Sequence, residues 1–276
     1  MLYLHTVILV NDMVKRVFLM SVLVLVAFSA INAKGNSLLH QTVQSIEAKF
    51  MELSRSATYV TAKGKPVAQR ISFLDENDLV LPAGTKIRQI ALIRHGEPDL
   101  RKTGKFSYQE AKRFVAEYDS VGIVVPDASF FNLPNPAQVK VFSSSINRAK
   151  ATAQYIFGVD GEMTVSPIFR EFESSMGHHS PNLRIPIKVW TSVARLKWVM
   201  GIDRQGAESF SDARKRAQLA ADTLAGATEE NPNVALVGHG LLNRYVQENL
   251  EEQGWHVVRN GGSGYLGTTI LVKVVR

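Results

Sequence analysis

Two distant segments of the chain share one pattern, an apolar strand that ends in a histidine followed by a glycine. The first covers residues 90–97 and reads IALIRHGE, and the second covers residues 234–240 and reads VALVGHG. Apolar strands of this kind are typical of parallel sheets covered on both faces, and such sheets bind ligands beyond the carboxyl ends of their strands. We therefore expect His95 and His239 to lie side by side at one edge of a parallel sheet.

The neighbours of the first histidine indicate an anionic ligand. Arg94 precedes it, and a planar guanidinium matches the oxygens of a phosphate or carboxylate. Gly96 follows it and carries no side chain, so the backbone can approach an anion closely. The strand end thus predicts a pocket for a small acidic molecule.

From Ile87 onward, strand patterns alternate with helix patterns. We expect strands at 139–142, 234–238 and 268–275, and helices at 107–118, 147–157, 187–200, 209–224 and 241–250. A capping box at Ser107 and Glu110 opens the first helix, and Gly158 closes the second. This alternation predicts an α/β fold with a mostly parallel central sheet and helices on both faces.

Four motifs occur in a fixed order along this region. They are LIRHGE at 92–97, VFSSSINRA at 141–149 followed by Thr152 and Ala153, FRE at 169–171, and VGHG at 237–240. Together they resemble the histidine phosphatases, also called the phosphoglycerate mutase-like superfamily, from about Ile87 to Val275. Ser145 stands where that family usually has proline. The resemblance implies a phosphoglycerate mutase-like fold.

The resemblance also implies roles for the residues of the first, second and fourth motifs. His95 is the expected nucleophile, which holds the phosphoryl group as a phosphohistidine. Arg94 and Arg148 clamp the phosphoryl oxygens, and Gly96 lies beside them in the binding site. His239 hydrogen-bonds the phosphoryl group, and we expect it to be an imidazolium there because a nearby anion raises a histidine pKa.

Glu171 in the third motif is the expected general acid, which protonates the leaving oxygen. That role needs a carboxyl group whose pKa is raised by partial burial. Glu173 is a competitor that periodicity cannot separate, and the match to the FRE motif favours Glu171. Beyond Phe172 the family's usual Gly-x-Trp-Glu-Gly continuation is missing, so the sequence leaves the identity of the substrate open.

These residues predict a metal-independent phosphomonoester hydrolase that acts on a phosphorylated, acidic small molecule and needs no cofactor. A phosphomutase of the same family is the nearest alternative. A non-catalytic module that binds phosphorylated ligands is a second alternative, and an anchored scaffold is the weakest. The reactive residues are retained in all four motifs, which favours catalysis.

Three further features are assigned structural or peripheral roles. His178 and His179 are adjacent and have no carboxylate-rich motif nearby, so we expect no metal site there. Glu208 and Ser209 resemble a Gly-Glu-Ser element of some relatives, and we expect N-capping of the next helix. We expect residues 183–190 and Trp198 to form a helical lid over the pocket, whose aromatic side chains belong to the core.

The first 33 residues are typical of a secretory signal peptide. Lys15 and Arg16 precede an apolar run at 17–31, and Ala33 offers a cleavage site. Met13 is a possible true start. The run is shorter than the roughly 20 residues of a spanning helix. We therefore expect an exported protein, periplasmic or secreted. The alternative is an uncleaved membrane anchor through residues 17–31. We expect contact with a membrane only if this segment is not cleaved.

The rest of the chain is divided into an N-terminal extension at 34–86 and a histidine phosphatase domain at 87–276. Apolar residues at helical spacing between Leu38 and Leu53 predict one amphipathic helix in the extension. The net charge of +7 favours acidic small molecules or anionic lipid surfaces, but no basic helix interleaved with aromatics indicates nucleic-acid binding. The chain has no cysteine, which excludes disulfides and thiolate metal sites. The sequence leaves the oligomeric state open.

Overall fold

The computed structural model describes residues 37–100, 103–132, 139–158, 163–172, 176, 183–202 and 208–275. The predicted signal peptide with its possible start at Met13, the competitor Glu173, and the pair His178–His179 lie outside these residues. The chain divides into two compact units, Met1–Ser45 and Ile46–Arg276. Described residues of the first unit, 37–45, are helical, and the second unit begins with helical residues 46–56. The predicted domain boundaries after residues 33 and 86 stay predictions.

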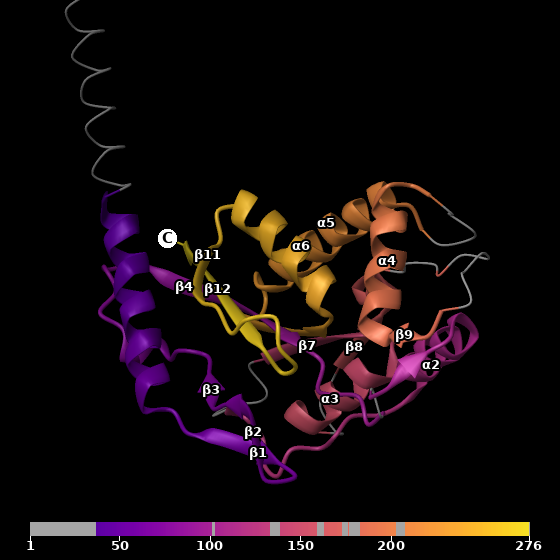
Figure 1. Ribbon diagram of the computed structural model, residues 1–276. Helices are drawn as coiled ribbons and strands as arrows, with labels where there is room; N and C mark the ends of the chain where they lie inside the picture. Colours follow the sequence, from indigo (N-terminus) through magenta and orange to yellow (C-terminus); the bar gives the residue numbers. More distant parts are fainter. Residues whose placement is uncertain are drawn as a thin grey trace, which may run out of the picture. The chain divides into compact units, whose positions relative to one another are not determined.

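A six-stranded sheet forms the centre of the larger unit (Figure 1). Its strand order is β11-β12-β4-β10-β7-β8. The strands are β4 (Lys86–Arg94), β7 (Val139–Ser144), β8 (Met163–Ser166), β10 (Asn233–Gly238), β11 (His256–Arg259) and β12 (Thr268–Val275). The neighbours β4, β10, β7 and β8 run parallel, whereas β12 is antiparallel to both β4 and β11. The expected α/β fold with a mostly parallel central sheet is confirmed.

Helices cover both faces of this sheet. They are α2 (Tyr108–Ser120), α3 (Asn147–Phe157), α4 (Ile187–Val199), α5 (Phe210–Ala227) and α6 (Gly240–Glu252). Helices α5 and α6 pack together over one face, and α3 lies on the other face against β7 and β10 (Figure 1). The capping box of Ser107 with Glu110 is present, and Gly158 ends α3 with a φ of 85°. None of the helices in these ranges is long and apolar enough to span a membrane.

Short elements surround the main sheet. They are the hairpin β1 (Tyr59–Ala62) and β2 (Lys65–Gln69), the pair β3 (Ile71–Ser72) and β6 (Phe131–Asn132), the pair β5 (Lys105–Phe106) and β9 (Ile185–Pro186), and the 3-10 turns η1 (Glu76–Asp78) and η3 (Pro167–Phe169). The predicted helix of the extension is found at residues 37–56. Buried Gln89 on β4 bonds both backbone groups of Leu74, at 3.0 and 2.8 Å. Residues 46–86 are therefore part of the larger unit.

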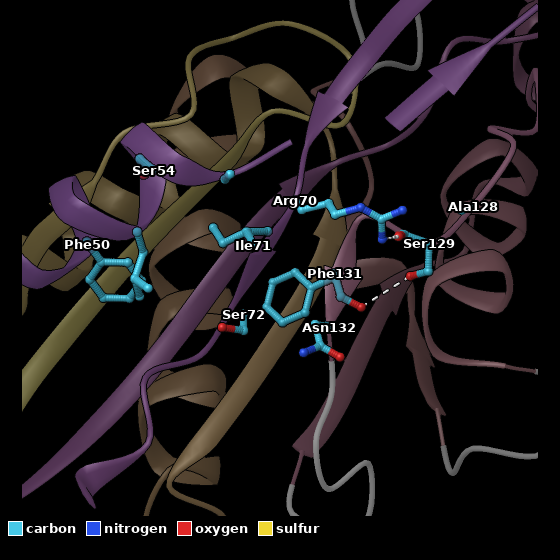
Figure 2. Close-up of a pocket in the computed structure, with 11 residues that line it drawn as sticks. Phe50, Ser54, Arg70, Ile71, Ser72, Ala128, Ser129, Phe131 and Asn132 are labelled. Carbon is cyan, nitrogen blue, oxygen red and sulfur yellow. Dashed lines mark hydrogen bonds between the residues drawn. The ribbon is translucent and has the colours of Figure 1, made fainter. Parts of the chain in front are cut away.

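A cleft of about 620 Å³ lies beside the end of the first helix, β3 and β6 (Figure 2). Arg70 lies over it and donates to the carbonyl of Ser129 at 3.2 Å. It is lined by Phe50, Leu53, Ser54, Ala57, Arg70, Ile71, Ser72, Ala128, Ser129, Phe131 and Asn132. Since no predicted site residue lines it, this cleft is separate from the histidine pair.

Candidate active site

The two histidines meet where β4 and β10 end. These strands are parallel neighbours with Gly238 opposite Arg94, and the backbone N–H of His95 donates to the carbonyl of Gly238 at 2.9 Å. The ring centroids of His95 and His239 are 5.1 Å apart, with ring planes at 60°. Both side chains are buried, at 2% and 0% exposure. The sheet register therefore brings together the two imidazoles that the sequence pattern paired.

His95 is held in one tautomer by its neighbours. Its Nδ1 lies 2.8 Å from the carbonyl oxygen of Gly96, which can only accept, so Nδ1 carries the proton. Its Nε2 lies 3.0 Å from Nε of Arg148, a group that can only donate. The lone pair of His95 is therefore on Nε2, the nitrogen that points into the pocket of charged side chains.

Arg148 links both imidazoles. It follows the end of β7 as the second residue of α3, and its side chain is 3% exposed. Besides His95, its guanidinium contacts Nδ1 of His239 at 3.3 Å, donates to the carbonyl of Tyr118 at 3.1 Å, and forms an ion pair with Asp119. The buried guanidinium thus places a positive charge beside both imidazoles, with Asp119 as its counter-ion.

His239 is neutral in these surroundings. Arg148 donates to its Nδ1, so its proton is on Nε2, which donates to the hydroxyl of Ser144 at 2.8 Å. Burial lowers the pKa of His239 well below 6.5, and the positive charges of Arg148 and Arg94 lower it further. An imidazolium at this position requires the negative charge of a phosphoryl group; the sequence-based expectation of such an imidazolium stays a prediction.

Arg94 lies on the other side of the pair. Its guanidinium carbon lies 4.4 Å from the ring centroid of Tyr265, and that ring is 5.6 Å from the ring of His95. It also donates to the carbonyl of Ser263. Within the described part of the chain, its buried Nε has no hydrogen-bond partner. Arg94 thus retains a buried donor beside the two imidazoles.

Two tyrosines that the sequence analysis did not single out lie beside the ring of His95. The hydroxyls of Tyr118 on α2 and Tyr265 on the β11–β12 loop are 3.1 Å apart. Burial, together with Tyr265, raises the pKa of Tyr118. The guanidinium carbon of Arg148 lies over the ring of Tyr118, 4.6 Å from its centroid. The guanidinium of Arg94 lies over the ring of Tyr265 in the same way. Each arginine is thus held over an aromatic face, a favourable cation–π arrangement.

Gly96 helps to fix the orientation of the His95 ring. Its carbonyl accepts from His95, and its N–H donates to the hydroxyl of Thr152 at 2.9 Å. A Cβ at this position would lie 3.2 Å from the side chain of Ile123, closer than ordinary packing. The expected role of Gly96 in substrate binding stays a prediction, while its role in fixing the His95 ring follows from these contacts.

The side chain of Glu171 lies at the N-terminus of helix α6, and this helix begins directly after His239. Its Oε1 accepts from the backbone N–H groups of Phe172 at 3.0 Å and Leu242 at 3.1 Å, and its Oε2 accepts from Leu241 at 3.5 Å. The residue is half-buried, and its expected role as the general acid stays a prediction. The carboxyl group is therefore fixed relative to the strand–helix corner that carries His239.

The loop that carries Glu171 is held by an arginine that the sequence did not single out. Arg216 on α5 donates to the carbonyls of Ile168 and Arg170, at 2.9 and 2.7 Å, and to that of Glu171 at 3.4 Å. Its remaining donors face the carboxylate of Glu208, one of them at 3.0 Å. The predicted N-cap is Ser209, which accepts from Asp212, while Glu208 pairs with Arg216. The eight-residue spacing of Glu208 and Arg216 is the only sequence signal for this pair.

The aromatic residues of α4 belong to the core, as expected. Trp190 is buried and donates to the carbonyl of Phe106 at 2.8 Å, and buried Trp198 donates to that of Glu208 at 2.7 Å. No cluster of three histidine or acidic side chains suited to a metal occurs among the described residues. The described site therefore brings together two imidazoles, two arginines and a fixed carboxyl group.

Comparison with known proteins identifies the class. Residues 90–272 match the Histidine phosphatase superfamily (branch 1). The chain belongs to this superfamily. No curated protein matches it.

Among solved structures, a mycobacterial glucosyl-3-phosphoglycerate phosphatase is 21% identical, with 68% of this chain and 91% of that chain covered and a TM-score of 0.39. Phosphoserine phosphatase from Entamoeba histolytica is 20% identical over 66% and 89% of the two chains, with a TM-score of 0.37. Phosphoglycerate mutase from Bacillus anthracis is 16% identical over 68% and 89%, with a TM-score of 0.43. At these values the likenesses carry no argument about the substrate.

Proposed function

We propose that this protein hydrolyses phosphate monoesters through a phosphohistidine on His95. The observation that carries the proposal is the buried Nε2 lone pair of His95, placed between the guanidinium of Arg148 and a second imidazole. A neutral imidazole nitrogen with positive groups around it suits attack on a phosphoryl group, because that reaction depends on positioning and charge neutralisation.

In the first step, Nε2 of His95 forms a bond to phosphorus and the bond to the leaving oxygen breaks. The phosphoryl oxygens replace Nε2 as acceptors for Arg148 and take the buried Nε–H of Arg94. These donors stabilise the charge that builds on the equatorial oxygens. The negative charge of the bound phosphate monoester also raises the pKa of His239, so the imidazole takes the proton of the monoester monoanion and donates to the phosphoryl group as an imidazolium. It returns this proton to inorganic phosphate as the phosphate leaves.

Glu171 supplies the proton for the leaving oxygen. In this proposal the proton passes through Oε2, because Oε1 holds the two shorter bonds from backbone N–H groups. In the second step, Glu171 takes a proton from water as the water oxygen attacks phosphorus and the bond to His95 breaks. Inorganic phosphate leaves, and both side chains return to their starting states.

The test is a panel of aryl and alkyl phosphate monoesters assayed with wild type and His95→Ala. We expect His95→Ala to abolish turnover and the acid-labile phosphoprotein that wild type forms. His256→Ala, a half-buried histidine on β11, is the matched control and should retain both. A phosphoprotein that survives His95→Ala would place the nucleophile elsewhere. Phosphate binding without turnover in wild type would favour the non-catalytic module.

Glu171→Gln tests the acid separately. It should slow alkyl phosphates, which are poor leaving groups, far more than aryl phosphates. An equal loss for both classes would assign the proton to another residue.

The proposal includes an exported enzyme whose partner is a phosphorylated, acidic small molecule. The basic net charge of +7 and the signal-peptide pattern before Ala33 support it. Recovery of the protein from the periplasm with Lys34 as its first residue is the expected result. A protein retained in the membrane with its N-terminus intact would instead support the anchor through residues 17–31.

A further inference from the structure

Helix α4 is apolar on two opposite faces. Ile187, Trp190, Ala194 and Trp198 form one face, which is buried. Val189, Val193, Leu196 and Met200 form the other and are all exposed; we call them the α4 stripe. Their spacing of four, three and four residues places them in one row along a helix. A helix that is apolar on an exposed face as well as on its buried face indicates contact with something beyond its own core.

Exposed apolar residues gather on this helix and on the short segments at its two ends. Of sixteen large hydrophobic side chains exposed among the described residues, seven lie between positions 183 and 202. They are Leu183, Val189, Val193, Leu196, Val199, Met200 and Ile202. Single exposed apolar side chains are ordinary, but a gathered group of this kind marks an interaction surface.

Three basic side chains of α4 lie on either side of the stripe, one near it and two farther round the helix. At 100° per residue, Lys197 lies about 70° to one side of the row and Lys188 and Arg195 about 110–130° to the other. No aspartate or glutamate occurs from 183 to 201. None of these three basic side chains forms an ion pair with another described residue. The helix therefore presents an apolar row between positive borders, with no acidic residue of its own to neutralise them.

We propose that the α4 stripe docks the protein on an anionic phospholipid surface. Apolar side chains in a row with lysine and arginine beside them are the pattern of helices that lie in the plane of a membrane interface, with the apolar side chains among the acyl chains and the cations at the headgroups. A second copy of this chain fits the stripe less well, because symmetric contact would bring two sets of basic residues together without acidic partners. The proposal does not depend on hydrolysis at the histidine pair.

The experiment uses the fact that the chain contains no cysteine. A single Val193→Cys, labelled with an environment-sensitive fluorophore, reports on the stripe itself, so any contribution of residues 1–36 to membrane binding does not obscure it. Vesicles of phosphatidylcholine with and without phosphatidylglycerol are added to the full exported protein. We expect a blue shift with the anionic vesicles and a weaker one or none with phosphatidylcholine alone. The same label at Leu219→Cys on α5 should not shift.

The second arm compares Leu196→Glu with Leu219→Glu. The two leucines are matched, with 60% and 54% of their surfaces exposed, and only the first belongs to the stripe. With the stripe label in place, Leu196→Glu should weaken the binding that the label reports by at least about tenfold, from the lost burial of one leucine. Leu219→Glu should leave it unchanged.

Three results would overturn the proposal. The first is a label on the stripe that does not respond to anionic vesicles. The second is an equal response at residues 193 and 219, which indicates adsorption of the whole surface. The third is sedimentation showing a dimer that Leu196→Glu dissociates, without a lipid response, which would assign the stripe to a second copy of the chain.

Discussion

Replacing Arg216 by methionine should destabilise the protein and also impair the transfer of a proton to the leaving group. The guanidinium makes three bonds to the backbone carbonyls of residues 168, 170 and 171, each with a net value of about 0.5–1.5 kcal/mol. The ion pair with Glu208 adds about 1 kcal/mol, since both side chains remain partly accessible to water. We therefore expect the free energy of unfolding to fall by about 2.5–5.5 kcal/mol.

The catalytic consequence follows from what those carbonyls hold in place. Arg216 fixes the backbone on both sides of Arg170, and so fixes where the Glu171 carboxyl meets the N-terminus of α6. The Arg216→Met variant should therefore lose activity on alkyl phosphates more than on aryl phosphates, in the same direction as Glu171→Gln. Purely structural damage would lower both rates together.

The assays are chemical denaturation and the alkyl-to-aryl rate ratio, with Arg214→Met as the control. Arg214 is exposed on the same helix, so its replacement should change neither quantity. A double-mutant cycle with Glu208→Gln should give a coupling energy of about 1 kcal/mol. An Arg216→Met variant with the stability of Arg214→Met and an unchanged rate ratio would refute the reasoning.

Three further predictions concern the strand ends and the extension. Burial and Arg148 lower the pKa of His239, so this side chain stays neutral in the folded protein, whereas in the unfolded chain it takes up a proton below about pH 6.5. The free energy of unfolding should therefore fall as the pH drops, by up to about 1.4 kcal/mol per pH unit. Denaturation of His239→Gln across pH 5–7 should lack this component; an unchanged pH dependence would contradict it. Gly238→Ala should reduce kcat, because a Cβ there would lie 2.5 Å from Oδ1 of Asn243 and must displace that side chain or the backbone before His239. Wild-type kinetics would show that the turn between β10 and α6 can adjust. Gln89→Leu should lower the free energy of unfolding by about 2–4 kcal/mol, because both backbone groups of Leu74 lose their hydrogen-bond partner. A decrease below about 1 kcal/mol in chemical denaturation would mean that water takes the place of the Gln89 side chain.

The local elements with strong boundary signals could be predicted from the sequence. Helix α3 was expected at 147–157 and is found there, because Gly158 takes a positive φ that ends it. The start of α2 was set by its capping box. The short strands β8 and β11 were missed, since four residues with partly exposed side chains give too short a pattern to recognise. The antiparallel direction of β12 was not predicted either, because hydrophobic periodicity does not encode strand direction.

The sequence alone determined the family and the α/β fold, because an apolar strand followed by His-Gly recurs and the motifs keep their order. Which residues carry chemistry is a prediction from the same motifs. The meeting of His95 with His239 was implied by that recurrence and is present in the structure. Their tautomers, the lowered pKa of His239, the bonds of Glu171 to α6 and the clamp by Arg216 were decided only by the tertiary structure. Each of these four features depends on local backbone geometry or on residues of other helices and strands. A hydrogen bond or a desolvation energy exists only once folding has brought the two groups close together.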